Sequence, residues 1–193
     1  DLHYPLRRQR QMCIRDRYPG GKSRAVPKLL QHLPSREITE YREPFLGGGS
    51  MAIEMTRRLP EEIPIWVNDL YEPLYNFWVQ LRDNGDYLHS ELMRAKNFHP
   101  DEESARKLFL DSKENLNDSK RSQEDRAVDF YIINKCSFSG LTESSSFSKA
   151  ASNSNFSHRG IERLPEYSKL ISRWKITNVS YEELVSDETL TSV

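Results

Sequence analysis

The sequence predicts an α/β fold in which an open parallel sheet is interrupted by a mainly helical insertion. Early in the chain, short apolar runs typical of buried strands alternate with segments of helical period. Two polar, amphipathic segments follow with no strand between them, and a strand-like run returns near residue 174. We expect strands at 38–45, 63–67 and 174–179, and helices at 23–33, 50–59, 70–81, 101–116, 122–135 and 164–171.

The chain divides into four parts on this pattern. Residues 1–17 are rich in arginine and have neither helical nor strand period, so we interpret them as a non-native or disordered basic leader. Their alternative interpretation is a basic arm that contacts DNA. Residues 18–84 form an α/β portion, 85–163 a helical insertion, and 164–193 a return to the sheet.

The first strand ends in a glycine-rich turn, and the second ends in an acidic residue. The run Ile38 to Phe45 leads into Gly47-Gly48-Gly49, and Ser50 is the expected N-cap of the next helix. Asp69 stands at the carboxyl end of the nearly all-apolar second run. Because ligands of open α/β sheets bind outside the carboxyl ends of the strands, both features point to one crevice.

Composition limits the classes of protein to consider. The formal net charge is −1, so any nucleic-acid surface must be a local patch. The two cysteines, Cys13 and Cys136, lie in no CxxC pattern, which predicts no disulfide framework and no metal site. No run approaches the roughly 18 apolar residues of a membrane helix. We therefore expect a cytoplasmic protein without a membrane segment.

The segment between Cys136 and His158 is rich in serine and carries regularly spaced phenylalanines. Its composition alone indicates a flexible linker. Linkers seldom carry regularly spaced aromatic residues, so an ordered binding loop is the sharper hypothesis. The three phenylalanines are Phe138, Phe147 and Phe156.

The glycine turn and Asp69 together match a nucleotide-binding pattern. Gly47-x-Gly49-x-x-Ala52 fits the dinucleotide fingerprint, and Asp69 lies 22 residues beyond Gly47, at the spacing of the residue that holds a ribose hydroxyl. Asp69 is equally explained as a helix cap, and the two roles can coexist. Gly21-Lys22-Ser23 is no P-loop, because position 16 is Asp16 rather than glycine and no strand precedes it.

Two motifs resemble those of a known family. Glu43-Pro44-Phe45-Leu46-Gly47-Gly48-Gly49-Ser50 is similar to the (D/E)PF(x)G(x)G(S/T) motif of S-adenosylmethionine-dependent amino-methyltransferases. With Tyr18-Pro19-Gly20-Gly21-Lys22 upstream, the chain resembles the Dam-like, D12-class N6-adenine DNA methyltransferases. That resemblance implies a Rossmann-like methyltransferase sheet, here incomplete, with an inserted target-recognition subdomain. It also implies S-adenosylmethionine as cofactor, held by Tyr18, Gly21, Lys22, Glu43, Phe45, Gly47, Gly49 and Asp69.

The resemblance extends to the recognition region and implies double-stranded DNA as partner. Residues 130–141 are similar to the family's apolar-Asn-(Arg/Lys)-x-x-aromatic-(Asn/Ser)-Gly-Leu segment. The candidate DNA-binding residues are Asn134, Lys135, Phe138, Ser139, Gly140 and Arg159, with Lys149, His158 and Arg163 as further basic candidates.

The chain departs from the family pattern in two places. Asn155 to Gly160 is only a loose echo of the family's Phe-Asn-x-Pro-Phe-Gly-like stretch. The (D/N)PPY motif, whose acceptors hold the adenine amino group and whose aromatic stacks on the flipped base, is missing. We therefore name no catalytic residue and expect a truncated, amino-terminal fragment that does not methylate by itself.

Other functions remain open on the sequence. The glycine fingerprint and Asp69 also suit an NAD-dependent oxidoreductase. A non-catalytic nucleic-acid-binding module is a second alternative, and RNA could replace DNA as the substrate. The target site and the oligomeric state do not follow from these motifs.

Overall fold

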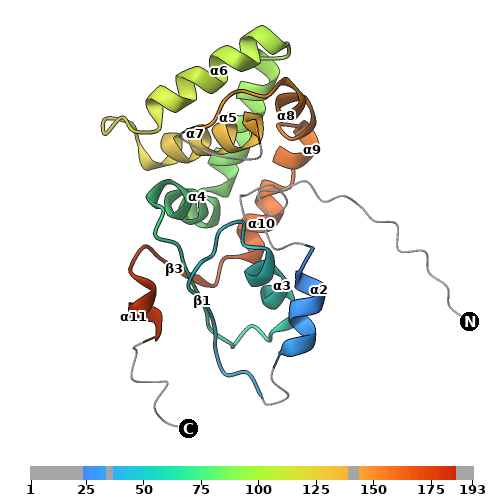
Figure 1. Cartoon of the computed structure of the whole chain (residues 1–193), viewed down its shortest axis with the longest axis vertical. Helices are drawn as coiled ribbons and strands as arrows, with labels where there is room; N and C mark the ends of the chain where they lie inside the picture. The colour runs from blue at the N-terminus through green and yellow to red at the C-terminus, as the bar shows by residue number, and fades with distance from the viewer. Residues whose placement is uncertain (1–23, 34–36, 139–143, 186–193) are drawn as a thin grey trace, which may run out of the picture.

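The computed structural model describes residues 24–33, 37–138 and 144–185. Figure 1 shows the strands with helices α2, α3 and α11 at one end of these residues, and helices α5 to α9 gathered at the other. Helices α4 (Glu72–Asp83) and α10 (Leu164–Leu170) lie between the two. We call residues 24–83 and 164–185 the sheet region, and residues 85–161 the helical region.

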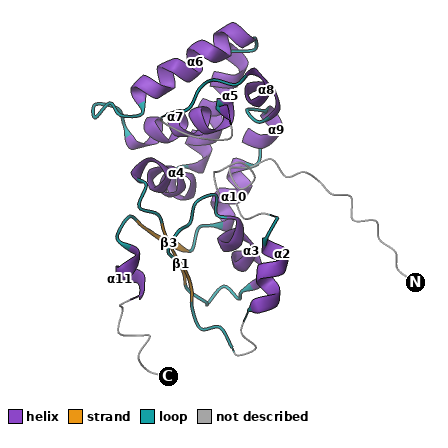
Figure 2. Ribbon diagram, viewed as in Figure 1, coloured by secondary structure: helices purple, strands orange, loops and turns teal. Residues whose placement is uncertain are grey.

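The strands of the described residues form one parallel sheet in the order β1 (Tyr41–Glu43), β2 (Ile65–Asn68), β3 (Trp174–Thr177). Figure 2 shows how small this sheet is beside the helices. The strands fall within or beside the predicted runs but are shorter. Pro44 follows β1 directly, and a proline has no N–H to give to a neighbouring strand.

The two faces of the sheet differ in chemistry. One face is apolar and packs into the core with α3 and α4. The other carries Arg42, Trp66 and Lys175 side by side in register. The Lys175 ammonium lies 3.5 Å and the Arg42 guanidinium 4.8 Å from the centre of the Trp66 ring. Residues of the apolar face are Ile65, Val67, Trp174 and Ile176.

Short helices flank the sheet. The predicted helix at 23–33 is an α-helical turn followed by a 3-10 turn, and α11 follows β3. The expected N-cap of α3 was wrong by one residue: Gly49 caps the helix in a left-handed conformation, and Ser50 is already helical. The bounds are α2 (Val26–Leu29), η1 (Leu30–His32), α3 (Ser50–Arg58) and α11 (Tyr181–Val185).

The helical region packs around aromatic side chains. Helix α7 lies against α4, α5 and α6, and the ring of Phe130 from α7 lies 5.7 Å from that of Phe77 in α4. Ser122 caps α7 at the start of the helix predicted over 122–135, its hydroxyl accepting from the Asp125 N–H at 3.1 Å. The helices are α5 (Gly85–Phe98), α6 (Glu102–Asn115), α7 (Gln123–Cys136), α8 (Lys149–Ser154) and α9 (His158–Ile161).

Helix α5 was not predicted, because Asn84-Gly85 reads as a break between elements. The pair does end α4, but Gly85 also starts the next helix. A glycine is required there for a packing reason. A Cβ on Gly85 would lie 2.5 Å from the Cβ of Ser168 in α10, closer than two carbons can approach.

The described part of the serine-rich segment is folded, so the flexible-linker interpretation was wrong for residues 144–157. Two of its serines cap short helices: Ser148 accepts from the Ala151 N–H and Ser157 from the Gly160 N–H. Ser137 and Phe147 also pair as an antiparallel bridge. Serine here satisfies helix ends rather than conferring flexibility.

Among the described residues, no helix has the length and apolar character that a bilayer span requires.

Candidate functional site

The glycine turn after β1 has a backbone that only glycine adopts without strain. Gly47 has φ 51° and Gly49 has φ 66°, both in the left-handed region. The Gly49 N–H closes the turn onto the Leu46 carbonyl at 2.9 Å. A Cβ on Gly49 would also lie 2.9 Å from the Trp78 ring, so the turn sits directly on that indole.

Asp69 ties this turn to the start of α4. Its Oδ2 accepts from the Gly47 N–H at 2.8 Å, and its Oδ1 accepts from the Tyr71 N–H at 3.1 Å. The structure thus brings together the two features that the sequence placed at one crevice. An ionised carboxylate offers about four acceptor positions, so two protein bonds leave capacity for a ligand hydroxyl. Asp69 is half-buried, and the helix-start role is present as well.

Trp78 supports the glycine turn from the side of the core. Its Nε1 donates to the Gly47 carbonyl at 3.0 Å, and its ring lies 5.5 Å from that of Trp174 in β3. Both polar groups of the Gly47 backbone are therefore engaged, one by Asp69 and one by Trp78. The turn is ordered without a ligand, so a ligand that binds there does not have to order it, and the entropic cost of binding is smaller.

Exposed apolar side chains follow β1 and β2 at this edge of the sheet. Phe45, after β1, is 65% exposed, and Leu70, which follows Asp69 directly, is 71% exposed. The Phe45 ring lies 5.6 Å from that of Tyr181, at the start of α11. Large apolar side chains exposed together beside a polar group mark a ligand surface. Leu70 and Tyr181 were not among the predicted site residues. The available signal was that Leu70 follows Asp69 directly and that Tyr181 comes shortly after β3.

Glu43, the last residue of β1, is buried in the protein interior. Its side chain is buried and accepts from the Tyr41 hydroxyl at 2.9 Å. Burial, together with the Glu43 charge, raises the pKa of Tyr41 well above its usual range. Glu43 supports the end of β1 through this bond to Tyr41, and its contact with a ligand stays a prediction. Tyr18, Gly21 and Lys22 lie outside the described residues.

The candidate DNA-binding residues are split between the interior and the surface. Asn134 and Lys135 are buried in α7, so in this structure neither side chain lies on a face that DNA reaches. Their position at the end of an apolar helical run explains the burial. Arg159 is exposed on α9. Ser139 and Gly140 lie outside the described residues.

Phe138 is the aromatic candidate that stays on the surface. Its side chain is 67% exposed, yet its backbone is fixed, because its N–H donates to the Ser146 carbonyl at 3.1 Å. The neighbouring Ser148 N–H donates to the Cys136 carbonyl at 2.8 Å. An exposed ring on a fixed backbone can present a flat face to a base. Phe147 and Phe156 pack inside instead.

The basic candidates have different partners. The Lys149 ammonium pairs with Glu102, and the His158 Nε2 lies 2.8 Å from the side-chain Oδ1 of Asn97. The Arg163 guanidinium lies over the ring of Tyr167. No ion pair within the described residues involves Arg159, which leaves its charge available at the surface.

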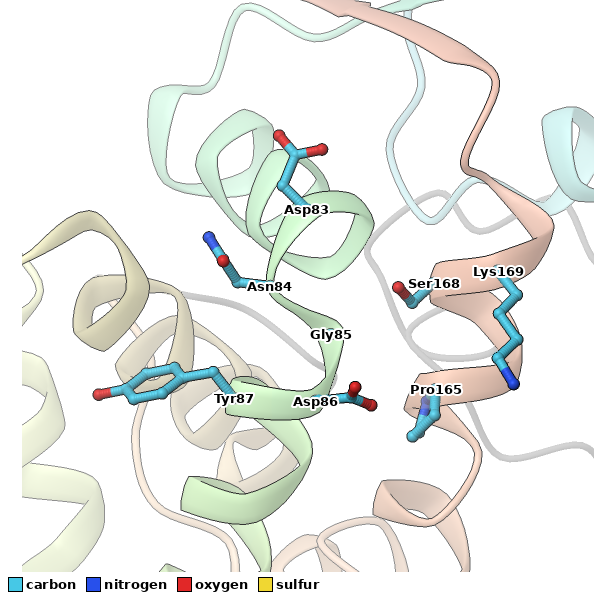
Figure 3. Close-up of a pocket in the computed structure, with 8 residues that line it drawn as sticks. All are labelled: Asp83, Asn84, Gly85, Asp86, Tyr87, Pro165, Ser168 and Lys169. Carbon is cyan, nitrogen blue, oxygen red and sulfur yellow. The ribbon is translucent and has the colours of Figure 1, made fainter.

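A separate pocket of about 310 Å³ lies where α4 meets α5, against α10 (Figure 3). It is lined by Asp83, Asn84, Gly85, Asp86, Tyr87, Pro165, Ser168 and Lys169, none of them a predicted site residue. It contains opposed charges and no link to the glycine turn. The sequence motifs meet instead at Asp69, on the carboxyl edge of the sheet.

The structure is that of an α/β protein in which the glycine turn and Asp69 meet at the carboxyl edge of a parallel sheet. Comparison with known proteins is more specific: the D12 class N6 adenine-specific DNA methyltransferase family matches residues 18–191. The chain belongs to this family.

Two curated relatives agree with the assignment. Over 133 residues the chain is 25% identical to the Type II methyltransferase M.MjaIII of Methanocaldococcus jannaschii, covering 65% of this chain and 46% of that protein. Over 128 residues it is 27% identical to the Type II methyltransferase M1.LlaDCHI of Lactococcus lactis subsp. cremoris, covering 65% of this chain and 41% of that protein. The matched part thus spans less than half the length of either relative.

Proposed function

We propose that this chain binds S-adenosylmethionine in the crevice at the carboxyl edge of its sheet. The observation that carries the proposal is the bond from the Gly47 N–H to Asp69, with exposed apolar side chains on either side. An acidic residue after the second strand accepts from ribose hydroxyls in nucleotide-binding sheets of this kind. Family membership supports the same cofactor.

Each part of the cofactor has a proposed partner. Asp69 accepts from the ribose hydroxyls through the acceptor positions that Gly47 and Tyr71 leave open. Leu70, Phe45 and Tyr181 supply apolar surface for the adenine ring. The glycine turn lets the backbone approach the methionine end closely, because Gly47 and Gly49 have no side chains. The sheet is then the incomplete Rossmann-like sheet of a methyltransferase.

The reaction proposed for the whole protein is methyl transfer from the sulfonium of the cofactor to N6 of adenine in DNA. The methyl group passes to the nitrogen, the sulfonium becomes a neutral thioether, and the amine loses one proton. The adenine amine is a weak nucleophile because its lone pair is delocalised, so alignment with the methyl group supplies much of the rate.

The 193 residues contain no (D/N)PPY sequence to accept the hydrogens of that amine. We propose that this chain binds the cofactor but does not transfer the methyl group by itself. A radioactive methyl-transfer assay on adenine-containing duplex DNA tests this, and incorporation above a no-enzyme blank would contradict it.

The proposed DNA surface is in the helical region. The exposed ring of Phe138 would stack against a base, and Arg159 would contact a phosphate, which positions the duplex without reading its sequence. Asn134 and Lys135 would act by supporting this surface from inside. We propose cytoplasmic location for the same protein, since its substrate would be genomic DNA.

Calorimetry with two ligands separates this proposal from its first rival. We expect S-adenosylhomocysteine to bind and NAD not to bind. Binding of NAD alone would favour the oxidoreductase. DNA binding with neither cofactor would favour a non-catalytic nucleic-acid module, and preference for a single-stranded RNA over duplex DNA would move the substrate to RNA.

A matched pair of variants locates the site. Asp69→Asn removes the charge while keeping the size of the side chain, and we expect at least a tenfold loss of S-adenosylhomocysteine affinity. Asp111→Asn makes the same change on the exposed face of α6 and should leave the affinity unchanged. Equal affinities for both variants would place the cofactor elsewhere.

A further inference from the structure

Asn68 is the buried amide at the centre of the sheet's carboxyl edge. It is the last residue of β2, and its side chain is only 1% exposed. A buried amide must satisfy two donor hydrogens and its carbonyl oxygen, and leaving either unpaired costs free energy. The partners that Asn68 uses therefore show what the fold gains by placing an amide there.

The amide makes four hydrogen bonds to segments far apart in the sequence. Its Nδ2 donates to the Pro44 carbonyl at 3.2 Å and to the Val179 carbonyl at 3.0 Å. Its Oδ1 accepts from the Val179 N–H at 3.0 Å and from the Thr177 hydroxyl at 2.9 Å. One side chain thus joins the chain leaving β1 to the chain leaving β3.

An amide suits the groups that these two segments present. The carbonyls of Pro44 and Val179 each need a donor, and the Asn68 Nδ2 supplies one hydrogen to each. Val179 lies beyond the last ladder pair, Asn68 with Thr177, and needs both a donor and an acceptor. An amide side chain supplies both from one plane, as a backbone peptide would, and so extends the pairing of β2 and β3 past its end.

The two anchored residues lie next to the exposed aromatic pair. Phe45 follows Pro44 directly, and Tyr181 lies two residues after Val179. Their rings are 5.6 Å apart although the residues are far apart in the sequence. The Asn178 amide nitrogen also donates to the Asp69 carbonyl at 2.7 Å, which fixes the position of Asp69 relative to the end of β3.

From these contacts we propose that Asn68 is a positioning residue: it sets the separation of Phe45 and Tyr181 and thereby the width of the cofactor crevice. This inference rests on the proposed cofactor site for its functional meaning. Asn68 itself does not touch the ligand, since its four bonds are all to the protein and it is buried.

Asn68→Asp tests the proposal with the smallest change. The carboxylate keeps an acceptor for Val179 and Thr177 but turns an oxygen toward the carbonyls of Pro44 and Val179, which repel it. Asn76→Asp is the matched control, because Asn76 is also buried and its Nδ2 donates to the Gln123 carbonyl at 2.8 Å, linking α4 to the helical region. Asn68→Ser, which deletes the amide without adding charge, serves if the aspartate variant does not fold.

The first readout needs no ligand. Aromatic-to-aromatic nuclear Overhauser contacts between Phe45 and Tyr181 should be lost in the Asn68 variant and kept in the Asn76 variant. Persistence of these contacts in a folded Asn68 variant would overturn the proposal, whether or not the chain binds S-adenosylhomocysteine.

The second readout is a double-mutant cycle on S-adenosylhomocysteine affinity. We expect Asn68→Asp to weaken binding about tenfold in the natural chain but less than twofold when Phe45 and Tyr181 are both alanine. An equal loss in both backgrounds would mean that Asn68 acts through general stability, and would contradict the proposal. If the natural chain bound no S-adenosylhomocysteine, the proposed cofactor site would fail, while the Overhauser contacts would still decide the positioning role.

Discussion

The carboxyl edge of the sheet and the core of the helical region place polar and aromatic side chains in opposite ways. At the carboxyl edge of the sheet, the Asn68 amide is inside and Phe45 and Leu70 are outside. In the helical region, aromatic rings such as Phe109 and Phe130 fill the core in the usual way. Exposed apolar side chains at this edge leave apolar area in water, which does not favour stability. The contrast supports the proposal that the sheet edge binds a ligand.

Within the helical region, two phenylalanines also differ in exposure. Phe138 and Phe156 come from one serine-rich segment, yet Phe138 is exposed on a fixed backbone while Phe156 is buried against Tyr131. The Lys96 ammonium lies 5.2 Å from the Phe156 ring centre and closes that side of the core. One aromatic of the segment thus supports the fold, and the other is free for a partner.

The largest expected effect separates these two phenylalanines. Phe156→Ala should lower the free energy of unfolding by about 3–5 kcal/mol, because it leaves a cavity in the core. Phe138→Ala should change it by less than about 0.5 kcal/mol, as surface substitutions do. Urea unfolding followed by circular dichroism measures both. Equal losses would mean that Phe138 is also a core residue.

The next effect concerns how the sheet region closes. The Arg173 guanidinium, just before β3, donates to the carbonyls of Pro60 and Ile63, and at 3.0 Å to those of Thr56 and Leu59. It thereby satisfies carbonyls at the carboxyl end of α3 that the helix leaves without partners. We expect Arg173→Ala to cost about 2–4 kcal/mol of unfolding free energy in a urea titration.

Two comparisons keep that prediction specific. Arg173→Lys retains the charge without the planar fork and should lose about half as much, since an ammonium cannot reach all four carbonyls. Arg159→Ala, on the exposed surface of α9, should be neutral for stability. A neutral Arg173→Ala would show that solvent serves those carbonyls equally well.

A pair of glycines distinguishes ligand binding from stability. Gly49→Ala places a side chain at φ 66° and against the Trp78 ring, so we expect a loss of about 1–3 kcal/mol and weaker S-adenosylhomocysteine binding. Gly85→Ala meets Ser168 and should also destabilise the protein. Its affinity for S-adenosylhomocysteine should stay unchanged in calorimetry, because the α4–α5 junction is not the proposed site.

The smallest effect is a titration in the helical region. Burial raises the pKa of the Asp129 carboxyl to about 6, against the opposing attraction of Arg121, whose Nε lies 2.9 Å from the carboxylate. The folded pKa exceeds the unfolded value, so the folded state binds the proton more tightly, and its stability relative to Asp129→Asn rises as the pH falls through 6. The difference should grow by roughly 1 kcal/mol between pH 7 and pH 5.

Carbon-13 NMR of the carboxyl group gives the pKa of Asp129 directly. A midpoint near 4 would show that the Arg121 pair and the bond to Ser112 outweigh the burial of the carboxylate.

The sequence was informative wherever local chemistry decides structure. The strand runs, the cap at Ser122, and the meeting of Gly47 with Asp69 all follow from residues close together or from the parallel order of strands. The buried amide of Asn68 was not predictable, because its partners lie 24 and 111 residues away. The burial of Lys135 was missed for a related reason, since which face of α7 is covered depends on helices elsewhere in the chain.

We propose above all that the cofactor binds at the sheet edge formed by Asp69, Gly47 and Leu70. The most direct measurement is a titration of unlabelled S-adenosylhomocysteine into the nitrogen-15-labelled chain, followed by amide chemical shifts. We predict that the largest shifts fall on the amides of Gly47, Gly49 and Leu70 and that those of Gly85 to Tyr87 stay unchanged. Shifts confined to the α4–α5 pocket, or none at millimolar ligand, would contradict the account.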